Sequence, residues 1–389
     1  MIRQSLKHRL QMIGSNRGKL YCMGSVRNCY IHIPFCKKIC SYCDFCKLFY
    51  DREYVSQYLD SLQLEIDTYY QGEELDTIYI GGGTPSSLSN SELEKLFSIL
   101  SVLKKSSSCE VTIEANFDSI TESKLDICKK YGVNRISFGL ESTHAWILEK
   151  MGRSLDLEYV RHIIAYCKKI GICNINVDLM YAFLGESLEE VEEDINFIQS
   201  LDVPHISTYS LILEEHTKLY LEKEKAIPEE LDAKMYEVIC SKLSDYTHYE
   251  ISNFCKEEYS SRHNLCYWQN REYYGFGLGA SGYLGDIRYT NTRSITHYLQ
   301  KKFRYQEENL SIYDKMEYEV ILNLRTKKGI SKKNFFDKYS MKLEECYHYQ
   351  ELVREGYLIE EDEYLAIPEK YFYLINEILV RLLEECCYE

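Results

Sequence analysis

Residues 29–46 read Cys29-Tyr-Ile-His-Ile-Pro-Phe-Cys36-Lys-Lys-Ile-Cys40-Ser-Tyr-Cys43-Asp-Phe-Cys46. The β-branched and aromatic residues of Cys29–Phe35 predict a strand, and three cysteines follow in the loop directly after it. A loop can turn three thiolates toward one centre, and such soft ligands select zinc or an iron–sulfur cluster. The stretch therefore predicts a strand that leads into a metal site.

The number and spacing of the thiolates separate these two metals. A structural zinc site needs a fourth ligand, which Cys46 could supply, but zinc ligands usually arrive as two separated pairs. Three thiolates suit a [4Fe–4S] cluster, because one iron then stays open to a substrate. We expect a [4Fe–4S] cluster on Cys36, Cys40 and Cys43, with zinc or inert thiols as alternatives.

The residues beyond this loop alternate between strand-like and helix-like segments. Six strands separated by helices predict a parallel sheet with right-handed crossovers. About 185 residues for six units suits an incomplete (β/α)6 barrel of the α/β class, with function at the C-terminal ends of the strands. The six strand-like runs are Cys29–Phe35, Thr77–Ile80, Val111–Ala115, Arg135–Leu140, Ile175–Met180 and His205–Leu213. Helical spacing is clearest in Tyr54–Tyr69, Ser89–Leu103, Leu157–Lys169 and Leu188–Ser200.

The pattern changes after residue 230. A helical segment and a loop-rich, aromatic stretch are followed by helices, a hairpin-like piece at Tyr357–Ile367 and a final helix. We expect a basic N-terminal extension (1–28), the partial barrel (29–230), a connecting region (231–310) and a mostly helical, winged-helix-like C-terminal domain (311–389).

Composition excludes several classes of protein. The chain has 389 residues, 46 Lys+Arg against 61 Asp+Glu, and a formal net charge of −15. This acidic balance argues against nucleic acid as a partner. No apolar run approaches the ~20 residues of a membrane span. The 16 cysteines follow no secretory signal, so we expect a cytoplasmic protein with reduced thiols.

The cysteine loop and its surroundings resemble the radical S-adenosylmethionine (SAM) proteins. The run from Tyr30 to Phe45 is similar to the haem chaperone HemW family, a relative of oxygen-independent coproporphyrinogen III oxidase. The resemblance extends from about residue 29 to 389. It implies that the open iron is chelated by the amino and carboxylate groups of SAM, and that reduction cleaves SAM to a 5′-deoxyadenosyl radical.

The glycine-rich end of the second strand resembles the family's motif for the SAM amino group. It reads Ile80-Gly-Gly82-Gly83-Thr84-Pro, and glycines let a backbone approach a ligand closely. A tight turn is the alternative reading. By the same resemblance, Tyr30 and Tyr42 border the cluster and SAM.

Charged residues at later strand ends also match the family's SAM contacts. The resemblance assigns ribose contacts to Glu114 and Asp178 and the SAM carboxylate to Arg153, although each residue alone could serve in a surface ion pair. The family usually has Gln where this chain has Glu141. The Glu141 side chain has the same shape as the family's Gln but adds a negative charge.

A haem site is expected further along the chain. The run His263-Asn264-Leu-Cys-Tyr267-Trp268 resembles the family's haem-handling motif. Imidazole is a common axial ligand of haem iron, and aromatic rings stack on a porphyrin. A structural turn before a buried Trp is the alternative.

Three functions are compatible with these motifs. The leading hypothesis is a haem chaperone that holds a [4Fe–4S] cluster, SAM and haem, and delivers haem to respiratory proteins at a membrane surface. The second is a coproporphyrinogen III oxidase of porphyrin biosynthesis, and the third a radical SAM enzyme that acts on haem. The oxidase carries another Cys where this chain has Phe45, and a longer segment before its cysteines. Both differences favour the chaperone.

Overall fold

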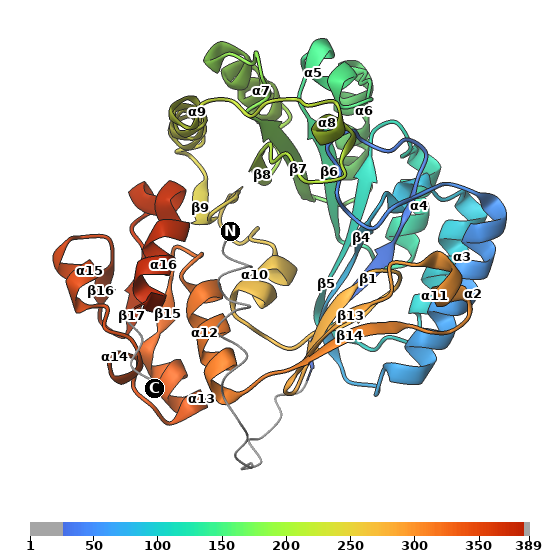
Figure 1. Cartoon of the computed structure of the whole chain (residues 1–389). Helices are drawn as coiled ribbons and strands as arrows, with labels where there is room; N and C mark the ends of the chain where they lie inside the picture. Colours follow the sequence, from blue (N-terminus) through green and yellow to red (C-terminus); the bar gives the residue numbers. More distant parts are fainter. Residues whose placement is uncertain (1–25, 385–389) are drawn as a thin grey trace.

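The computed structural model describes residues 26–384 and centres on one curved nine-stranded sheet (Figure 1). Its strand order is β11-β1-β4-β5-β6-β7-β8-β10-β9. The strands from β11 to β8 are parallel neighbours, whereas β10 and β9 run antiparallel at the far edge. The predicted incomplete α/β barrel is therefore confirmed. Most of the basic N-terminal extension lies outside the described residues.

All six predicted strands are present, with shifted ends. They are β1 (Asn28–Ile33), β4 (Leu75–Gly82), β5 (Lys105–Asn116), β6 (Arg135–Glu141), β7 (Asn174–Tyr181) and β8 (His205–Ser210). Alternate residues face opposite sides: Ile31 and Ile33 are buried against helices, while Tyr30 and His32 point into the barrel. The interior of the barrel is therefore polar and its outer face apolar.

Helices cover the outer face of the sheet (Figure 1). They are α2 (Arg52–Tyr69), α3 (Asn90–Leu100), α4 (Glu122–Lys130), α6 (Leu157–Lys169), α7 (Leu188–Ser200) and α9 (Glu229–Lys242), with short α5 (Ala145–Lys150) and α8 (Lys218–Leu221) after β6 and β8. Capping boxes of Ser89 with Glu92 and Ser187 with Glu190 fix the starts of α3 and α7. The helices expected at Leu157–Lys169 and Leu188–Ser200 have those bounds in the structure.

The helical segment expected directly after residue 230 is present as α9, but the stretch expected to be loop-rich, from there to about residue 310, differs from that prediction. It forms β9 (Thr247–Glu250), β10 (Asn253–Cys255), α10 (Arg262–Trp268), β11 (Tyr274–Phe276), α11 (Ile295–Leu299) and a separate sheet of β12 (Ser281–Leu284), β13 (Ile287–Asn291) and β14 (Arg304–Asn309). Strand β11 pairs with β1, Cys29 opposite Tyr274. Phe276 and Tyr298 belong to the barrel's own hydrophobic core, so this stretch completes the barrel.

The C-terminal part has a second core of its own. It comprises α12 (Ile312–Asn323), α13 (Lys332–Tyr339), α14 (Leu343–Cys346), α15 (Gln350–Arg354), α16 (Ile375–Glu384) and a small sheet of β15 (Ile330–Ser331), β17 (Tyr364–Ala366) and β16 (Ile359–Glu361). This mostly helical, winged-helix-like arrangement was expected. Helices α14 and α15 are separate, because extended Tyr347 between them turns its ring into the core.

Within residues 26–384, no helix combines the length and the apolar character that crossing a membrane requires.

Candidate functional site

The cysteine loop is clamped at both ends and in its middle. Strands β2 (Phe35–Cys36) and β3 (Leu48–Phe49) pair in parallel and close the loop at its base. In the middle, the Ser41 amide donates to the Met151 carbonyl at 3.1 Å and its hydroxyl donates to the Lys150 carbonyl at 2.6 Å. The loop therefore projects from the C-terminal end of β1, held against the segment after β6.

The three thiols of this loop are free and differ in exposure. Cys36 is buried, and Cys40 and Cys43 are half-buried. Burial raises the pKa of Cys36 to about 11, and burial also raises the pKa of Cys40 and Cys43. The thiols are therefore protonated at neutral pH, and a metal would have to displace their protons.

The donor set suits a cluster better than a single ion. Among residues 26–384, no three His, Cys, Asp or Glu side chains gather as the ligands of one metal ion. A four-iron cluster is wider, because each cysteine binds a different iron. A Cβ added to Gly83 would lie 3.0 Å from the Cys36 sulfur and 2.6 Å from the Pro34 carbonyl oxygen, so only glycine leaves this approach open. Three free thiols beside a bare backbone fit a [4Fe–4S] cluster.

The glycine-rich strand end lies directly beside the cysteine loop. The Gly83 amide donates to the Ile33 carbonyl at 2.9 Å, and the Thr84 hydroxyl donates to the Cys36 sulfur at 3.5 Å. Gly82 has φ +119°, and a Cβ there would lie 2.5 Å from the His32 ring. Glycine is therefore required at 82 for both conformation and space.

Glu114 connects the glycine-rich strand end to the barrel interior. Its carboxylate accepts hydrogen bonds from the Gly82 amide and the Tyr79 hydroxyl, each at 2.8 Å. Burial raises the pKa of Glu114 to about 7, and nearby Asp178 and Glu141 add repulsion. The three acids that the sequence singled out are thus gathered at one end of the barrel.

Glu141 and Arg153 form a buried ion pair. Arg153 Nη1 lies 2.7 Å from Glu141 Oε1, with side-chain exposures of 7% and 10%, and Nη2 donates to the Gly139 carbonyl at 2.8 Å. Burial raises the pKa of Glu141 to about 7, and the adjacent guanidinium opposes that rise. Tyr42 of the cysteine loop lies next to this carboxylate and helps to lower the pKa of Glu141.

Asp178 is oriented by two polar residues that the sequence did not single out. Asn176 Nδ2 donates to Asp178 Oδ1 at 2.8 Å, and the Ser137 hydroxyl donates to Oδ2 at 3.4 Å. The gathered carboxyl groups leave this end of the barrel rich in hydrogen-bond acceptors and in groups that can carry negative charge. Such a site suits a ligand that carries ammonium or sulfonium groups.

His32 connects the cysteine loop to β1. The Tyr30 hydroxyl and His32 Nδ1 are 2.9 Å apart, and His32 Nε2 lies 2.7 Å from the Cys46 carbonyl oxygen. Burial lowers the pKa of His32 to about 4, so the ring is neutral and can donate to that carbonyl. The backbone of Cys46, rather than its thiol, thereby ties the end of the cysteine loop to β1.

The predicted haem motif lies at the opposite end of the barrel, on α10. His263 is 1% exposed. Its Nδ1 is 2.7 Å from the Thr77 hydroxyl, and its Nε2 is 2.7 Å from the Tyr267 hydroxyl. Neither ring nitrogen is free to ligate iron in this arrangement. Haem ligation at His263 stays a prediction.

The remainder of the motif helps α10 to close the end of the barrel opposite the cysteine loop, which we call the floor. The His263 ring stacks on Tyr79, 5.1 Å between centroids, and its amide donates to Glu110 at 3.1 Å. Asn264, Tyr267 and Trp268 are half-buried. The motif therefore packs beneath the residues that hold Glu114.

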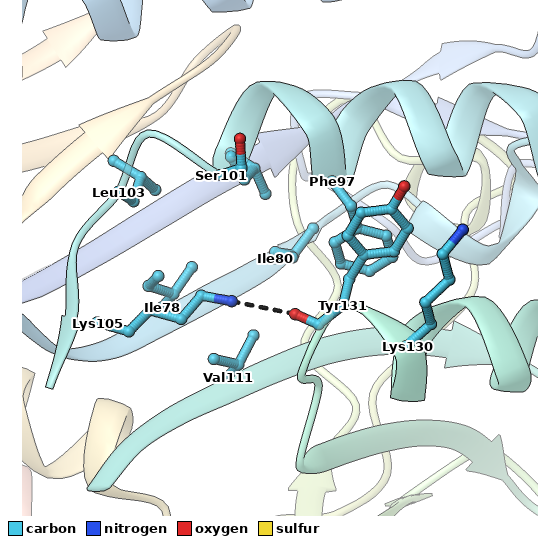
Figure 2. A pocket seen from close by; sticks show the side chains of 10 residues that line it. Ile78, Ile80, Phe97, Ser101, Leu103, Lys105, Val111, Lys130 and Tyr131 are labelled. Atoms are coloured by element: carbon cyan, nitrogen blue, oxygen red, sulfur yellow. Dashed lines mark hydrogen bonds between the residues drawn. The ribbon is translucent and has the colours of Figure 1, made fainter. Parts of the chain in front are cut away.

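A cavity of about 410 Å³ lies away from this site, between the sheet and helices α3 and α4 (Figure 2). Its wall is mainly apolar, including Ile78, Ile80 and Val111, and Lys105 Nζ donates to the Tyr131 carbonyl at 3.1 Å. Its residues belong to the outer, helix-covered layer. We interpret it as a packing gap.

Comparisons with known proteins agree with this geometry. A sequence model of the radical SAM superfamily matches residues 30–198. The heme chaperone HemW of Bacillus subtilis (strain 168) is 39% identical over 378 residues, covering 92% of this chain and 100% of that protein. HemW of Escherichia coli (strain K12) is 30% identical, covering 92% and 98%. The structure of coproporphyrinogen III oxidase (HemN) from Escherichia coli, described as a radical SAM enzyme, shares the fold: its TM-score is 0.80 at 19% identity, covering 92% of this chain and 89% of that one.

Proposed function

The chain belongs to the HemW family of radical SAM proteins, and on that premise we propose that it is a haem chaperone. The observation that carries the proposal is the similarity to HemW of Bacillus subtilis, which extends along the whole length of that protein. Phe45 supports the same reading, because the related oxidase has a fourth cysteine at this position.

We propose Cys36, Cys40 and Cys43 as the ligands of a [4Fe–4S] cluster. SAM would lie across the neighbouring strand ends, with Gly82, Gly83 and Thr84 lining its amino-acid part. When bound, the cluster and SAM supply one-electron chemistry. The protein's own part is to hold SAM against the cysteine loop: Glu114 and Asp178 offer acceptors to hydroxyl groups, and Arg153 offers a planar donor to a carboxylate.

Haem is the proposed cargo, and haem-accepting respiratory proteins at a membrane surface are the proposed recipients. We place the protein in the cytoplasm. Support for that placement is that every cysteine among the described residues is a free thiol, which suits a reducing compartment.

The test is anaerobic reconstitution with iron and sulfide, followed by titration with ferric haem. In parallel, the protein is incubated with SAM, reductant and coproporphyrinogen III. The proposal expects stoichiometric haem binding and no porphyrin product. Protoporphyrinogen formed over many turnovers would make the protein an oxidase instead.

A pair of cysteine variants tests the cluster separately. Cys40→Ala is expected to lose most of the iron and sulfide, because one of three protein ligands is gone. Cys173→Ala is the matched control, since Cys173 is an exposed thiol just before β7. Equal iron and sulfide in the two variants would contradict the assignment.

A further inference from the structure

The loop after β8 exposes apolar side chains beside the cysteine loop. We call residues 211–225 the mouth loop. Within it, Ile212 and Leu221 are each 68% exposed, whereas Leu219 is buried in an apolar cluster that also takes in Tyr42. The Leu219 amide donates to the Ser41 carbonyl at 3.0 Å. This exposed apolar surface is therefore fixed at the same end of the barrel as the gathered acids.

An imidazole without a partner stands in the middle of the mouth loop. His216 is exposed, and its ring makes no hydrogen bond, ion pair or ring contact with any residue from 26 to 384. Its backbone has φ +71°, a left-handed conformation that costs energy for a residue with a side chain. Next to it, the buried Thr217 hydroxyl donates to the Glu214 carbonyl at 2.7 Å and fixes the turn. The His216 ring is thus exposed on a turn that this hydrogen bond stabilises.

The charges of the mouth loop are arranged asymmetrically around His216. The acids Glu214 and Glu215 precede it, and the exposed lysines Lys223 and Lys225 follow. Lys218 pairs with Glu222, and Glu224 pairs with Lys150, but Lys223 and Lys225 have no carboxylate partner among the described residues. The α8 side of the loop therefore offers two unpaired cations.

A free imidazole, exposed apolar side chains and unpaired lysines together match one ligand chemistry. Haem is an apolar disc. Its iron binds imidazole, and its two carboxylate groups pair with cations. The buried His263 offers no free ring nitrogen. Resting on the proposed haem binding, we propose that haem docks on the mouth loop. The disc covers Ile212 and Leu221, His216 ligates the iron, and Lys223 and Lys225 pair with the carboxylates.

Histidine variants test the ligand. Ferric haem is titrated anaerobically into the wild-type protein, His216→Ala and His297→Ala, with absorbance spectra recorded throughout. His297 is the matched control, because it is exposed on α11, well apart from α8 in Figure 1. His216→Ala should bind haem at least about tenfold more weakly and with a changed spectrum. Wild-type affinity and spectrum in His216→Ala would overturn the ligand assignment.

The apolar contact is tested with Ile212→Ser/Leu221→Ser, compared with Tyr305→Ser on β14, where Tyr305 is 76% exposed. We expect weaker haem binding, again by at least about tenfold, only in the mouth-loop variant. SAM binding and cluster content are measured in both variants. Unchanged values there would show that the loss of haem affinity is local.

The chain's only two tryptophans give an independent readout. Trp146 on α5 packs against the same apolar cluster as Leu219 of the mouth loop, whereas Trp268 lies on α10 at the opposite end of the barrel. Energy transfer from an excited indole to haem falls steeply with distance. Haem should therefore quench Trp146 in Trp268→Phe more strongly than it quenches Trp268 in Trp146→Phe. The reverse order would place haem at the floor and overturn the proposal.

These outcomes separate the location from the function. If the wild-type protein binds no haem, the proposed chaperone function fails. If it binds haem and every mouth-loop variant binds equally well, only the docking site fails.

Discussion

Arg153 holds Glu141 at 2.7 Å in a pocket where both side chains are almost fully buried. This is the guanidinium proposed to receive the SAM carboxylate. A ligand that approaches Arg153 must therefore compete with a carboxylate already in place.

Glu141→Gln should raise the affinity for SAM about three- to tenfold. The amide still accepts the hydrogen bond from Arg153 but no longer competes as an anion. Equilibrium dialysis of labelled SAM against the reconstituted protein measures the change. Arg153→Lys is the counterpart and should weaken binding, because lysine lacks the planar fork. A weaker affinity in Glu141→Gln would mean that the charge itself contacts the ligand.

Gly82→Ala should abolish SAM binding and destabilise the protein by at least about 2 kcal/mol. The added methyl group would lie 2.5 Å from the His32 ring, which ties down the cysteine loop. Gly356→Ala is the control: its φ is also positive, at +80°, but nothing lies within 4 Å of its added Cβ. We expect this control to cost about 1 kcal/mol, measured by chemical denaturation. Equal losses would show that conformation alone, and not contact with His32, sets the cost.

His263→Ala should lower the free energy of unfolding by about 2–4 kcal/mol. It removes two ring hydrogen bonds and a ring stacked on Tyr79 from a buried site. The exposed His297→Ala should change it by less than about 0.5 kcal/mol. Denaturant titration of both variants checks this. A His263→Ala protein as stable as the control would contradict the role of α10 as a packed floor.

Stability should fall as pH rises from about 4.5 to about 7, in part because of Glu65. This buried carboxyl accepts hydrogen bonds from the Gly277 amide, Asn291 and Tyr298, and burial raises its pKa to about 7. The folded state then holds a proton that the unfolded state has released, so this contribution is complete below pH 4.5 and lost above pH 7.

Glu65→Gln isolates that effect. As the pH rises from 4.5 to 7, the unfolding free energy of the wild type should fall relative to that of the variant by up to about 3 kcal/mol. Denaturant titrations of the anaerobically purified proteins at several pH values measure it. A difference that does not vary with pH would show that Glu65 keeps the same charge in both states.

The sequence was sufficient for those parts of the fold that are encoded locally. Alternation in Tyr30–Ile33 and helical spacing in Leu188–Ser200 both reflect which face is buried, and each segment carries that pattern by itself. The capping residues Ser89 and Ser187 indicated where two of the helices begin. The gathering of Glu114, Glu141 and Asp178 also followed, because the C-terminal ends of parallel strands meet at one edge of the sheet.

Longer-range features had no local signal. Tyr274–Phe276 is three residues long and reads as loop, yet pairing with β1 makes it a strand. His263 is a polar residue in a motif, and nothing nearby in sequence reveals that Thr77 occupies one of its ring nitrogens. Tyr79 was passed over for the same reason, since its partner Glu114 comes from another strand. Such positions are decided by tertiary contacts rather than by spacing.

The pairing of β11 with β1 has a consequence during synthesis on the ribosome. Strand β1 emerges early, but its neighbour on one side is complete only when Phe276 has left the exit tunnel. For most of translation, the strand that leads into the cysteine loop presents a bare row of amides and carbonyls. Such an edge invites pairing with other chains. Until its late-made neighbour arrives, β1 of a nascent chain is therefore open to pairing with other chains.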